Sequence, residues 1–231
     1  MAGFILLALG SYLLGSVPLS HWLAKWYAGV DLKQYGSGNV GMLNLARATS
    51  KWLIIPVFIF DMGKGVLVVY VARQLGMADY QQVVVSLAAL IGHCWPVFLG
   101  FSGGRGVLTA LGIVLVLSPW LGLIGLALAI IFIPFHQLAF GVFLSLVALP
   151  PLGWFVGPLW GADKLALTIG FVAISLIMIF RRLSVPRSDI AATMPKTELL
   201  VNRFLFDRDI RDREAWVHRK PAEASREEPT K

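Results

Sequence analysis

Long apolar stretches with very few charges constrain the fold of this chain more than any other feature. Between Trp52 and Phe180 the sequence carries only a handful of ionisable residues. Of all 231 residues, 57% are hydrophobic and 14% are charged, whereas a soluble domain has about 45–50% apolar and about 25% charged residues. A helical membrane span needs about 20 consecutive apolar residues. We therefore expect an all-α, polytopic membrane helical bundle.

Proline and glycine breaks divide the apolar sequence into about seven helical segments. The first covers about residues 3–27 with an interruption at residues 15–18, the second about 52–72 and the third about 82–99. The remaining apolar stretch, residues 107–180, is broken at residues 118–119, 134, 150–151 and 161–163 into about four pieces. Some of these pieces are too short to span alone, so short or re-entrant helices are expected among them.

The distribution of cations predicts the orientation in the membrane. The first cations, Lys25 and Lys33, follow the first span, and a basic run opens at Arg181 after the last one. The positive-inside rule then places the N-terminus outside and the C-terminus in the cytoplasm. The net charge of +7 is explained by this orientation rather than by binding to nucleic acid.

Two domains follow from this charge pattern: a membrane domain of residues 1–181 and a charged cytoplasmic tail of residues 182–231. The segment 198–216 mixes leucine and phenylalanine with aspartate and arginine. It fits an amphipathic helix on the membrane surface and a plain solvated helix equally well.

Metal and disulfide chemistry are not expected. The single cysteine, Cys94, excludes an intramolecular disulfide and a cysteine-based metal site. The sequence has no Walker loop, no HExxH, no GxSxG and no cluster of metal ligands. Any chemistry would therefore depend on positioning an already activated substrate, without a metal or other cofactor.

Two glycine-rich loops are the first candidates for a binding site. One runs from Gly36 to Arg47 and the other from Gly103 to Gly106. Closely spaced glycines let backbone amides approach an anion, and arginine adds a fork of donors for phosphate. Two spans separate the loops, so both face the same compartment and can converge on one site. The alternative is that the first is a flexible interhelical turn and Arg105 a positive-inside anchor.

Three further polar residues lie within the apolar spans. Asp61 and Lys64 stand three apart on one helix and can pair, either as a structural pair or facing a water-filled cavity. His93, near the end of its span, is either a hydrogen-bonded packing residue or a contact to substrate. The sequence marks no carboxylate partner for it.

The ordered motifs resemble one family. They are Gly15-Ser-Val-Pro18, Gly36-Ser-Gly-Asn-Val-Gly41 with Asn44 and Arg47, Asp61 with Lys64-Gly65, and Gly92-His93 with Pro96-Val-Phe98, Gly103-Gly-Arg-Gly-Val107 and Thr109. This series is similar to the bacterial acyl-phosphate:glycerol-3-phosphate acyltransferases, the PlsY family. The close match covers about the first half of the chain.

The resemblance implies a multi-pass enzyme of the bacterial inner membrane with its active site at the cytoplasmic face. It would serve phospholipid synthesis by transferring a fatty acyl group from acyl phosphate to the 1-hydroxyl of glycerol 3-phosphate, giving lysophosphatidic acid and phosphate. Its partners would be these two substrates and membrane lipids, while protein partners are unknown. The expected catalytic residues are Ser37, Arg47, His93 and Arg105, with Asp61 and Lys64 in support. The expected phosphate-binding residues are Gly36, Ser37, Gly38, Asn39, Asn44, Arg47, Gly103, Gly104 and Arg105.

The chain departs from the family pattern in three places. Met42-Leu43 replace Ala-Thr, and Arg105 replaces the lysine of the Gly-Gly-Lys-Gly motif. The third motif, His-Arg-x-Asn-Ile-x-Arg, falls where this chain has residues 180–187 with neither histidine nor asparagine. Asn202 and Arg203 of the tail are the candidates to replace them. Two alternative functions follow: a homologue that binds phosphate ligands without catalysis, and an organic-anion transporter.

Overall fold

The regular structure in the described part of the chain is entirely helical. A computed structural model describes residues 1–156, 163–185 and 188–217. The helices are α1 (Ala2–Gly15), α2 (Leu19–Ala28), α3 (Met42–Ala48), α4 (Ile54–Gln74), α5 (Asp79–Cys94), α6 (Val107–Leu117), α7 (Pro119–Ile130), α8 (Leu138–Val156), α9 (Lys164–Leu183), α10 (Lys196–Phe206) and α11 (Arg213–Val217). Short 3-10 turns lie at Lys51–Leu53, Val97–Leu99 and Asp189–Ala191.

Five helical stretches among the described residues are long and apolar enough to cross a bilayer: Ala2–Ala28, Lys51–Gln74, Asp79–Leu99, Leu138–Val156 and Lys164–Leu183. Two shorter apolar helices, α6 and α7, lie between the third and fourth stretches. Leucine and isoleucine side chains of α1 and α4 remain exposed, as lipid-facing surfaces require. The expected bundle, with short helices in its later part, is confirmed.

One expected break is wrong. Pro150 and Pro151 were expected to end a helix, yet α8 continues through both to Val156. Proline lacks the amide that would bond the carbonyl oxygen four residues back, and the acceptor left by Pro150, the carbonyl oxygen of Leu146, accepts instead from Ser175 Oγ of α9 (2.7 Å). Helix α8 packs against α7 and α9, and a Cβ on Gly153 would lie 2.6 Å from the ring of Phe171, so this end of the helix lies against α9. The expected break at residues 161–163 lies partly outside the described residues, and Asp163 caps the start of α9 through its side chain.

Glycines bring pairs of helices into close contact. A Cβ added to Gly15 would lie 2.1 Å from the carbonyl oxygen of Ala89, so α1 and α5 approach at backbone distance. A Cβ on Gly112 would lie 2.2 Å from the carbonyl oxygen of Met62, which sets the same close approach between α4 and α6. Small residues at such crossings are a common device in membrane bundles, because packing rather than the hydrophobic effect drives association there.

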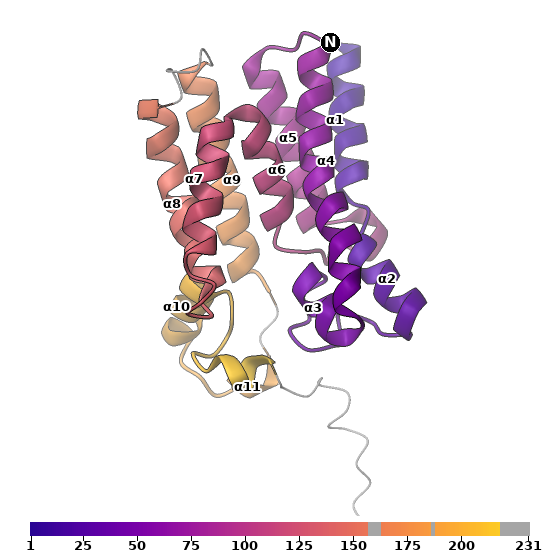
Figure 1. Cartoon of the computed structure of the whole chain (residues 1–231), viewed down its shortest axis with the longest axis vertical. Coiled ribbons are helices and arrows are strands. Elements are labelled where there is room, and N and C mark those ends of the chain that lie inside the picture. The colour runs from indigo at the N-terminus through magenta and orange to yellow at the C-terminus, as the bar shows by residue number, and fades with distance from the viewer. Residues whose placement is uncertain (157–162, 186–187, 218–231) are drawn as a thin grey trace, which may run out of the picture.

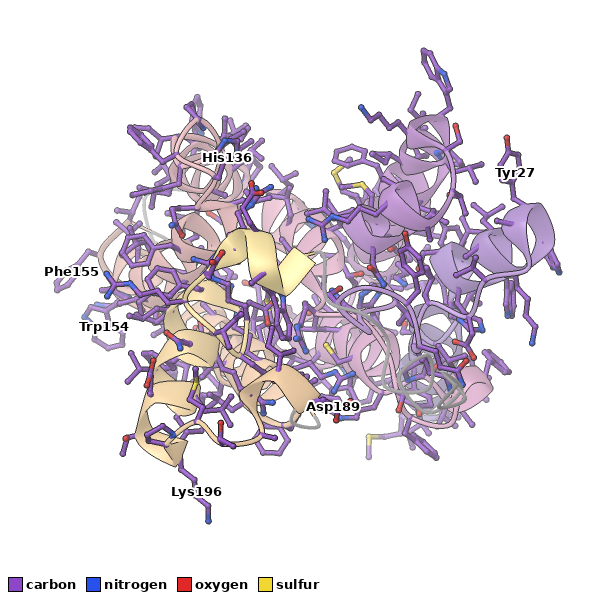
Figure 2. All side chains as sticks on the ribbon, turned by 90° about the horizontal axis from the view of Figure 1, so that it is seen from below. Tyr27, His136, Trp154, Phe155, Asp189 and Lys196 are labelled. Carbon is purple, nitrogen blue, oxygen red and sulfur yellow. The ribbon has the colours of Figure 1, made fainter. Side chains whose placement is uncertain are left out.

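The polar loops and the tail gather at one end of the bundle. In Figure 1, α2, α3, α10 and α11 lie at the lower end, away from the N-terminus. Figure 2 looks at this end from below, with Tyr27 of α2 and Lys196 of α10 on opposite sides of the view. The residues that could carry chemistry therefore cluster at one end of the bundle.

Within the described residues, the tail packs against the bundle and does not extend into solvent. Helix α10 packs against α8 and α9. Arg182, at the end of α9, donates Nη1 to the carbonyl oxygen of Phe204 (3.2 Å). Arg203 donates Nη1 to the carbonyl oxygen of Leu183 (3.0 Å) and Nε to Asp209 (2.7 Å). Asn202 and Arg203 thus hold the tail together and attach it to α9, since Asn202 bonds the carbonyl oxygen of Asp209 (3.2 Å).

Candidate functional site

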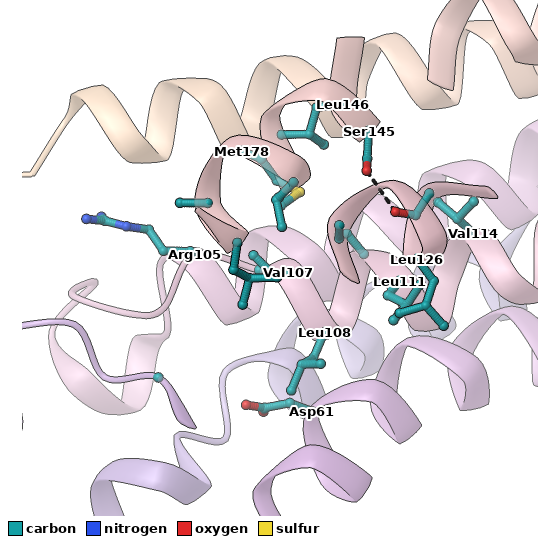
Figure 3. A pocket seen from close by; sticks show the side chains of 18 of the residues that line it. Asp61, Arg105, Val107, Leu108, Leu111, Val114, Leu126, Ser145, Leu146 and Met178 are labelled. Carbon is teal, nitrogen blue, oxygen red and sulfur yellow. Dashed lines mark hydrogen bonds between the residues drawn. The ribbon is translucent and has the colours of Figure 1, made fainter. Parts of the chain in front are cut away.

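A cavity of about 440 Å³ opens at the end of the bundle that carries the loops. Its walls come mainly from α6, α7 and α8, with Met178 of α9 on one side (Figure 3). Its interior is apolar, and Figure 3 shows Leu111, Leu126 and Val114 far from Arg105. Polar residues also line it: Asn39, Asp61, His93, Arg105, Arg182 and Asp207. The cavity therefore combines a charged mouth with an apolar interior.

Arg105 lies at this mouth, just before α6. Gly106, the N-cap residue of α6, has φ +79°, a backbone conformation that favours glycine. The Nε atom of Arg105 forms an ion pair with Asp207 Oδ1 at 2.6 Å. Its Nη1 donates to the carbonyl oxygen of Arg181 (3.3 Å). As expected from the sequence, the cation stands next to a helix N-terminus, where anions are favoured.

The second glycine loop is held by backbone bonds and by Arg181. The amide of Gly103 donates to the carbonyl oxygen of Cys94 (3.2 Å), and that of Gly104 to the carbonyl oxygen of His93 (3.1 Å). Arg181 donates Nη2 to the carbonyl oxygen of Gly103 (2.8 Å) and Nε to that of Gly104 (3.2 Å). Both amides are thus already bonded to the end of α5, and their expected role in binding phosphate stays a prediction.

His93 meets the same turn and a carboxylate. A Cβ on Gly104 would lie 2.3 Å from His93 Nε2, so glycine is required for the turn to lie against the imidazole. His93 Nδ1 lies 3.7 Å from Asp61 Oδ1, a neighbour that the sequence did not reveal. Asp61 also pairs with Lys64 at 2.9 Å, as expected from their spacing, and Lys64 donates to the carbonyl oxygen of Gly15 (3.1 Å).

Asn44 organises the first glycine loop from within. Its buried amide donates to the carbonyl oxygens of Leu32 (3.2 Å) and Tyr35 (2.9 Å), and its oxygen accepts from the amide of Ser37 (3.3 Å). Gly36 has φ +51°, and a Cβ there would lie 2.6 Å from Asn44 Oδ1. Both residues therefore shape the loop, because these three hydrogen bonds of the Asn44 side chain all join it to backbone groups.

The remaining candidates of this loop differ in their position relative to the cavity. Asn39 lines it, and its buried Oδ1 has no hydrogen-bond partner among the described residues. The Ser37 hydroxyl accepts from the amide of Asn39 (3.4 Å), and Gly38 is exposed. Arg47 is exposed on α3, and neither Ser37 nor Arg47 belongs to the cavity lining that the structure describes. Of the first loop, Asn39 is thus the polar side chain that faces the cavity.

Three charged residues of this region were missed from the sequence. The sequence predicts Arg181 and Arg182 only as orienting cations, and Asp207 as part of a tail helix that is either amphipathic on the membrane surface or solvated. Their position directly after the last span was a usable signal for the two arginines, because that place holds the third motif of the resembled family. Nothing in the sequence pairs Asp207 with Arg105.

Comparisons with known proteins point to one family. The family model described as glycerol-3-phosphate acyltransferase matches residues 5–188. Glycerol-3-phosphate acyltransferase 5 of Dehalococcoides mccartyi is 45% identical over 96% of this chain and 95% of its own. The enzyme of Parasynechococcus marenigrum is 38% identical over 85% and 90%.

Two solved structures share the fold. Both are crystal structures of PlsY, an integral membrane glycerol 3-phosphate acyltransferase. Its glycerol 3-phosphate form has a TM-score of 0.68 and 31% identity over 78% of this chain and 88% of that one. Its lysophosphatidic acid form has the same TM-score and 28% identity over 89% and 98%.

Proposed function

This chain belongs to the glycerol-3-phosphate acyltransferase family of integral membrane enzymes, and we propose that its acyl donor is acyl phosphate. As a member of that family it acylates glycerol 3-phosphate and forms lysophosphatidic acid. The proposal concerns the donor, the acceptor hydroxyl, the residues that act, and the side of the membrane on which they act.

One observation carries the proposal: the shape and polarity of the 440 Å³ cavity. An acyl phosphate has a phosphate head and a fatty chain, and the cavity has arginines at its mouth and apolar side chains inside. Arginine binds phosphate through its planar fork of donors. If the donor were a thioester, this mouth would also have to accommodate its much larger carrier.

We assign the phosphate of the donor to Arg105, aided by the N-terminus of α6. Arg182 lies at the same mouth, and its charge adds to the attraction for anions. The buried oxygen of Asn39 would accept a hydrogen bond from a hydroxyl of the acceptor. Arg47, exposed on α3 beside the first loop, would meet the phosphate of incoming glycerol 3-phosphate. Ser37 supports Asn39 through its hydroxyl.

In the proposed reaction the 1-hydroxyl oxygen of glycerol 3-phosphate attacks the acyl carbon. A new ester C–O bond forms, and the bond between the acyl carbon and the phosphate oxygen breaks, with its electron pair leaving on phosphate. His93 accepts the hydroxyl proton, and Asp61, 3.7 Å from Nδ1, favours the resulting imidazolium. The mixed anhydride is already activated, so positioning and charge stabilisation supply most of the rate.

We place the site at the cytoplasmic face of the bacterial inner membrane. Lys25 and Arg181 lie in the last turns of α2 and α9, and Lys33 follows α2 in the chain. In Figure 1 both helices end where the loops and the tail helices gather. The positive-inside rule orients such an end towards the cytoplasm. A reporter-fusion map that located Lys33 outside would contradict this orientation.

The direct test is an assay of purified protein in detergent with palmitoyl phosphate and glycerol 3-phosphate. We expect release of phosphate and formation of 1-acyl lysophosphatidic acid in equal amounts, with no product from palmitoyl-coenzyme A. Turnover with the thioester instead would overturn the donor assignment. Binding of both substrates without turnover would favour the non-catalytic homologue, whose basis is the absence of histidine and asparagine from residues 180–187.

The role of His93 in proton transfer is tested by a separate variant. His93→Gln keeps a polar side chain but cannot accept the proton, so we expect kcat to fall by roughly 10²–10⁴-fold. The KM values should change much less. An unchanged kcat would remove His93 from the proton transfer.

A further inference from the structure

The far end of the cavity is closed by side chains of the core. Val114 of α6, Leu121 of α7 and Leu149 of α8 line it and are 3%, 0% and 7% exposed. Because these side chains are almost inaccessible to solvent, the cavity does not open to the surface beside them, and the terminal methyl group of a chain that enters from the mouth meets them. The cavity is therefore a space of fixed depth.

The depth of the cavity is comparable to the length of part of a fatty acyl chain. Along α6 the lining runs from Gly106 to Val114, roughly 12 Å at about 1.5 Å per helical residue. Along α8 it runs from Leu138 to Leu149, roughly 16 Å by the same rise. Filling this space with methylenes is favourable, and forcing additional ones against the wall is not.

Two glycines of α7 line the deep part, and they differ in the space around them. A Cβ on Gly122 would lie 2.8 Å from Leu115 Cα, so this glycine is required for α7 to pack on α6. A Cβ on Gly125 would have a single neighbour within 4 Å, Ser145 Cβ at 3.8 Å. Helix packing thus does not require glycine at 125, and its missing side chain leaves room in the cavity.

Ser145 fixes the wall opposite Gly125. Its hydroxyl lies 2.8 Å from the carbonyl oxygen of Gly125, the bond drawn in Figure 3, and 2.9 Å from that of Gly141, so the two acceptors share its one proton. This bond holds α8 against α7, so the width of the cavity at Gly125 cannot adjust freely. The hydroxyl is hydrogen-bonded within the protein and therefore does not require a polar group of the ligand as a partner.

From this geometry we propose that Gly125, with Val114 at the closed end, sets the length of acyl chain that the enzyme accepts. The inference rests on the proposed function, because it takes the cavity as the acyl-chain site. A side chain at residue 125 would occupy the space of several methylenes. A smaller side chain at residue 114 would extend the space instead.

The test compares lauroyl, myristoyl, palmitoyl and stearoyl phosphate as donors for purified variants. Gly125→Leu should lower kcat/KM for palmitoyl relative to lauroyl phosphate by at least about tenfold, because each excluded methylene loses its burial. Gly125→Ala should shift the profile less, and Val114→Ala should shift it towards longer chains. The KM for glycerol 3-phosphate should stay unchanged in all three.

Gly10→Leu is the matched control. Gly10 lies exposed on α1, and a Cβ there has no neighbour within 4 Å, so its chain-length profile should equal that of the wild type. A profile of Gly125→Leu that falls equally for every donor, or does not change, would overturn the proposal.

A second measurement separates this inference from the assignment of the donor. Lysophosphatidic acids of the same chain lengths are added to each variant, and the shift in melting temperature is recorded. Gly125→Leu should lose stabilisation by the long ligands and keep that by the short ones. If the wild type does not use acyl phosphate, only the assignment of the donor is wrong. The dependence of ligand stabilisation on chain length still tests the role of Gly125.

Discussion

Arg105, in the turn before α6, and Asp207, at the end of α10, form an ion pair of 2.6 Å at the mouth of the cavity. Asp207 has φ +53°, an uncommon conformation for a residue other than glycine, so the carboxylate is held there by the fold of the tail. The carboxylate stands beside the guanidinium that we assign to the donor phosphate. The tail thereby reduces the positive charge available to substrate.

Asp207→Asn should therefore strengthen binding of phosphate substrates. Removal of one negative charge next to Arg105 makes the mouth more attractive to anions, and an effect of about 1 kcal/mol corresponds to a roughly fivefold lower KM for acyl phosphate. Steady-state kinetics at constant ionic strength measures this. A higher KM would mean instead that Asp207 is needed to hold Arg105 in its binding position.

Glu198→Gln supplies the control for this change. Glu198 is exposed in the first turn of the same helix and loses the same charge. Its variant should keep the wild-type KM, which separates a local effect at Arg105 from a change in the overall charge of the tail.

Arg181 should be needed for the shape of the second glycine loop. Its two bonds to the carbonyl oxygens of Gly103 and Gly104 require the spacing of a guanidinium. Arg181→Lys keeps the charge but leaves at least one buried carbonyl unpaired, at a cost of about 1–3 kcal/mol. We expect a lower melting temperature together with a loss of kcat, because the turn positions both Arg105 and His93.

Arg73 allows a matched comparison at the other end of the bundle. It also donates to a backbone carbonyl, that of Val116, at 2.9 Å. Arg73→Lys should affect the melting temperature only slightly and leave kcat unchanged. Equal kinetic losses in the two variants would show that Arg181 has no particular role in the site.

The sequence predicted the bundle because hydropathy and helix breakers act locally. The interruption near Pro18 and the short helices α6 and α7 follow from residues next to them in the chain. The continuation of α8 through Pro150 does not, because it depends on neighbouring helices that pack against it. A proline in the sequence predicts the loss of one backbone hydrogen bond. It does not reveal the tertiary contacts that offset this loss.

The site was predictable to the extent that its contacts are short-range. The pair of Asp61 and Lys64 follows from their spacing on one helix. The amides of Gly103 and Gly104 looked free because their acceptors, at the end of α5, are fixed only by tertiary structure. The approach of Asp207 to Arg105 depends on how the tail folds back, which no local pattern encodes.

Arg47 and Arg105 should differ in the substrate that each affects. We assign the exposed Arg47 to glycerol 3-phosphate and Arg105 to the donor. Arg47→Ala should then raise the KM for glycerol 3-phosphate by about tenfold or more, since a charged hydrogen bond contributes about 1.5–3 kcal/mol. Arg105→Ala should mainly raise the KM for acyl phosphate and lower kcat. If both variants raised the KM for the same substrate, this assignment of one arginine to each substrate would be contradicted. Lys51→Ala, on the neighbouring exposed turn, serves as the control.

Asp209 makes attachment of the tail depend on pH. Burial alone would raise the pKa of its carboxyl group, but hydrogen bonds from Arg203 (2.7 Å) and from the Ser188 hydroxyl (2.6 Å) outweigh burial and lower it. A lowered pKa in the folded state favours the carboxylate, so this contribution to stability is fully present above the usual value of about 3.9. It is lost as the pH falls through the lowered pKa.

A spin label at Glu198→Cys would measure this, since Cys94 is buried and does not compete for the label. Mobility of the label should be low at neutral pH and rise as the pH drops below about 4. Adding Asp209→Asn should raise the mobility already at neutral pH and abolish the pH dependence in that range, because the ion pair with Arg203 is gone. Asp189→Asn, in the exposed turn of the same segment, should behave as the wild type. If Asp209→Asn left the pH profile unchanged, the tail would be held by its apolar contacts and not by this carboxylate.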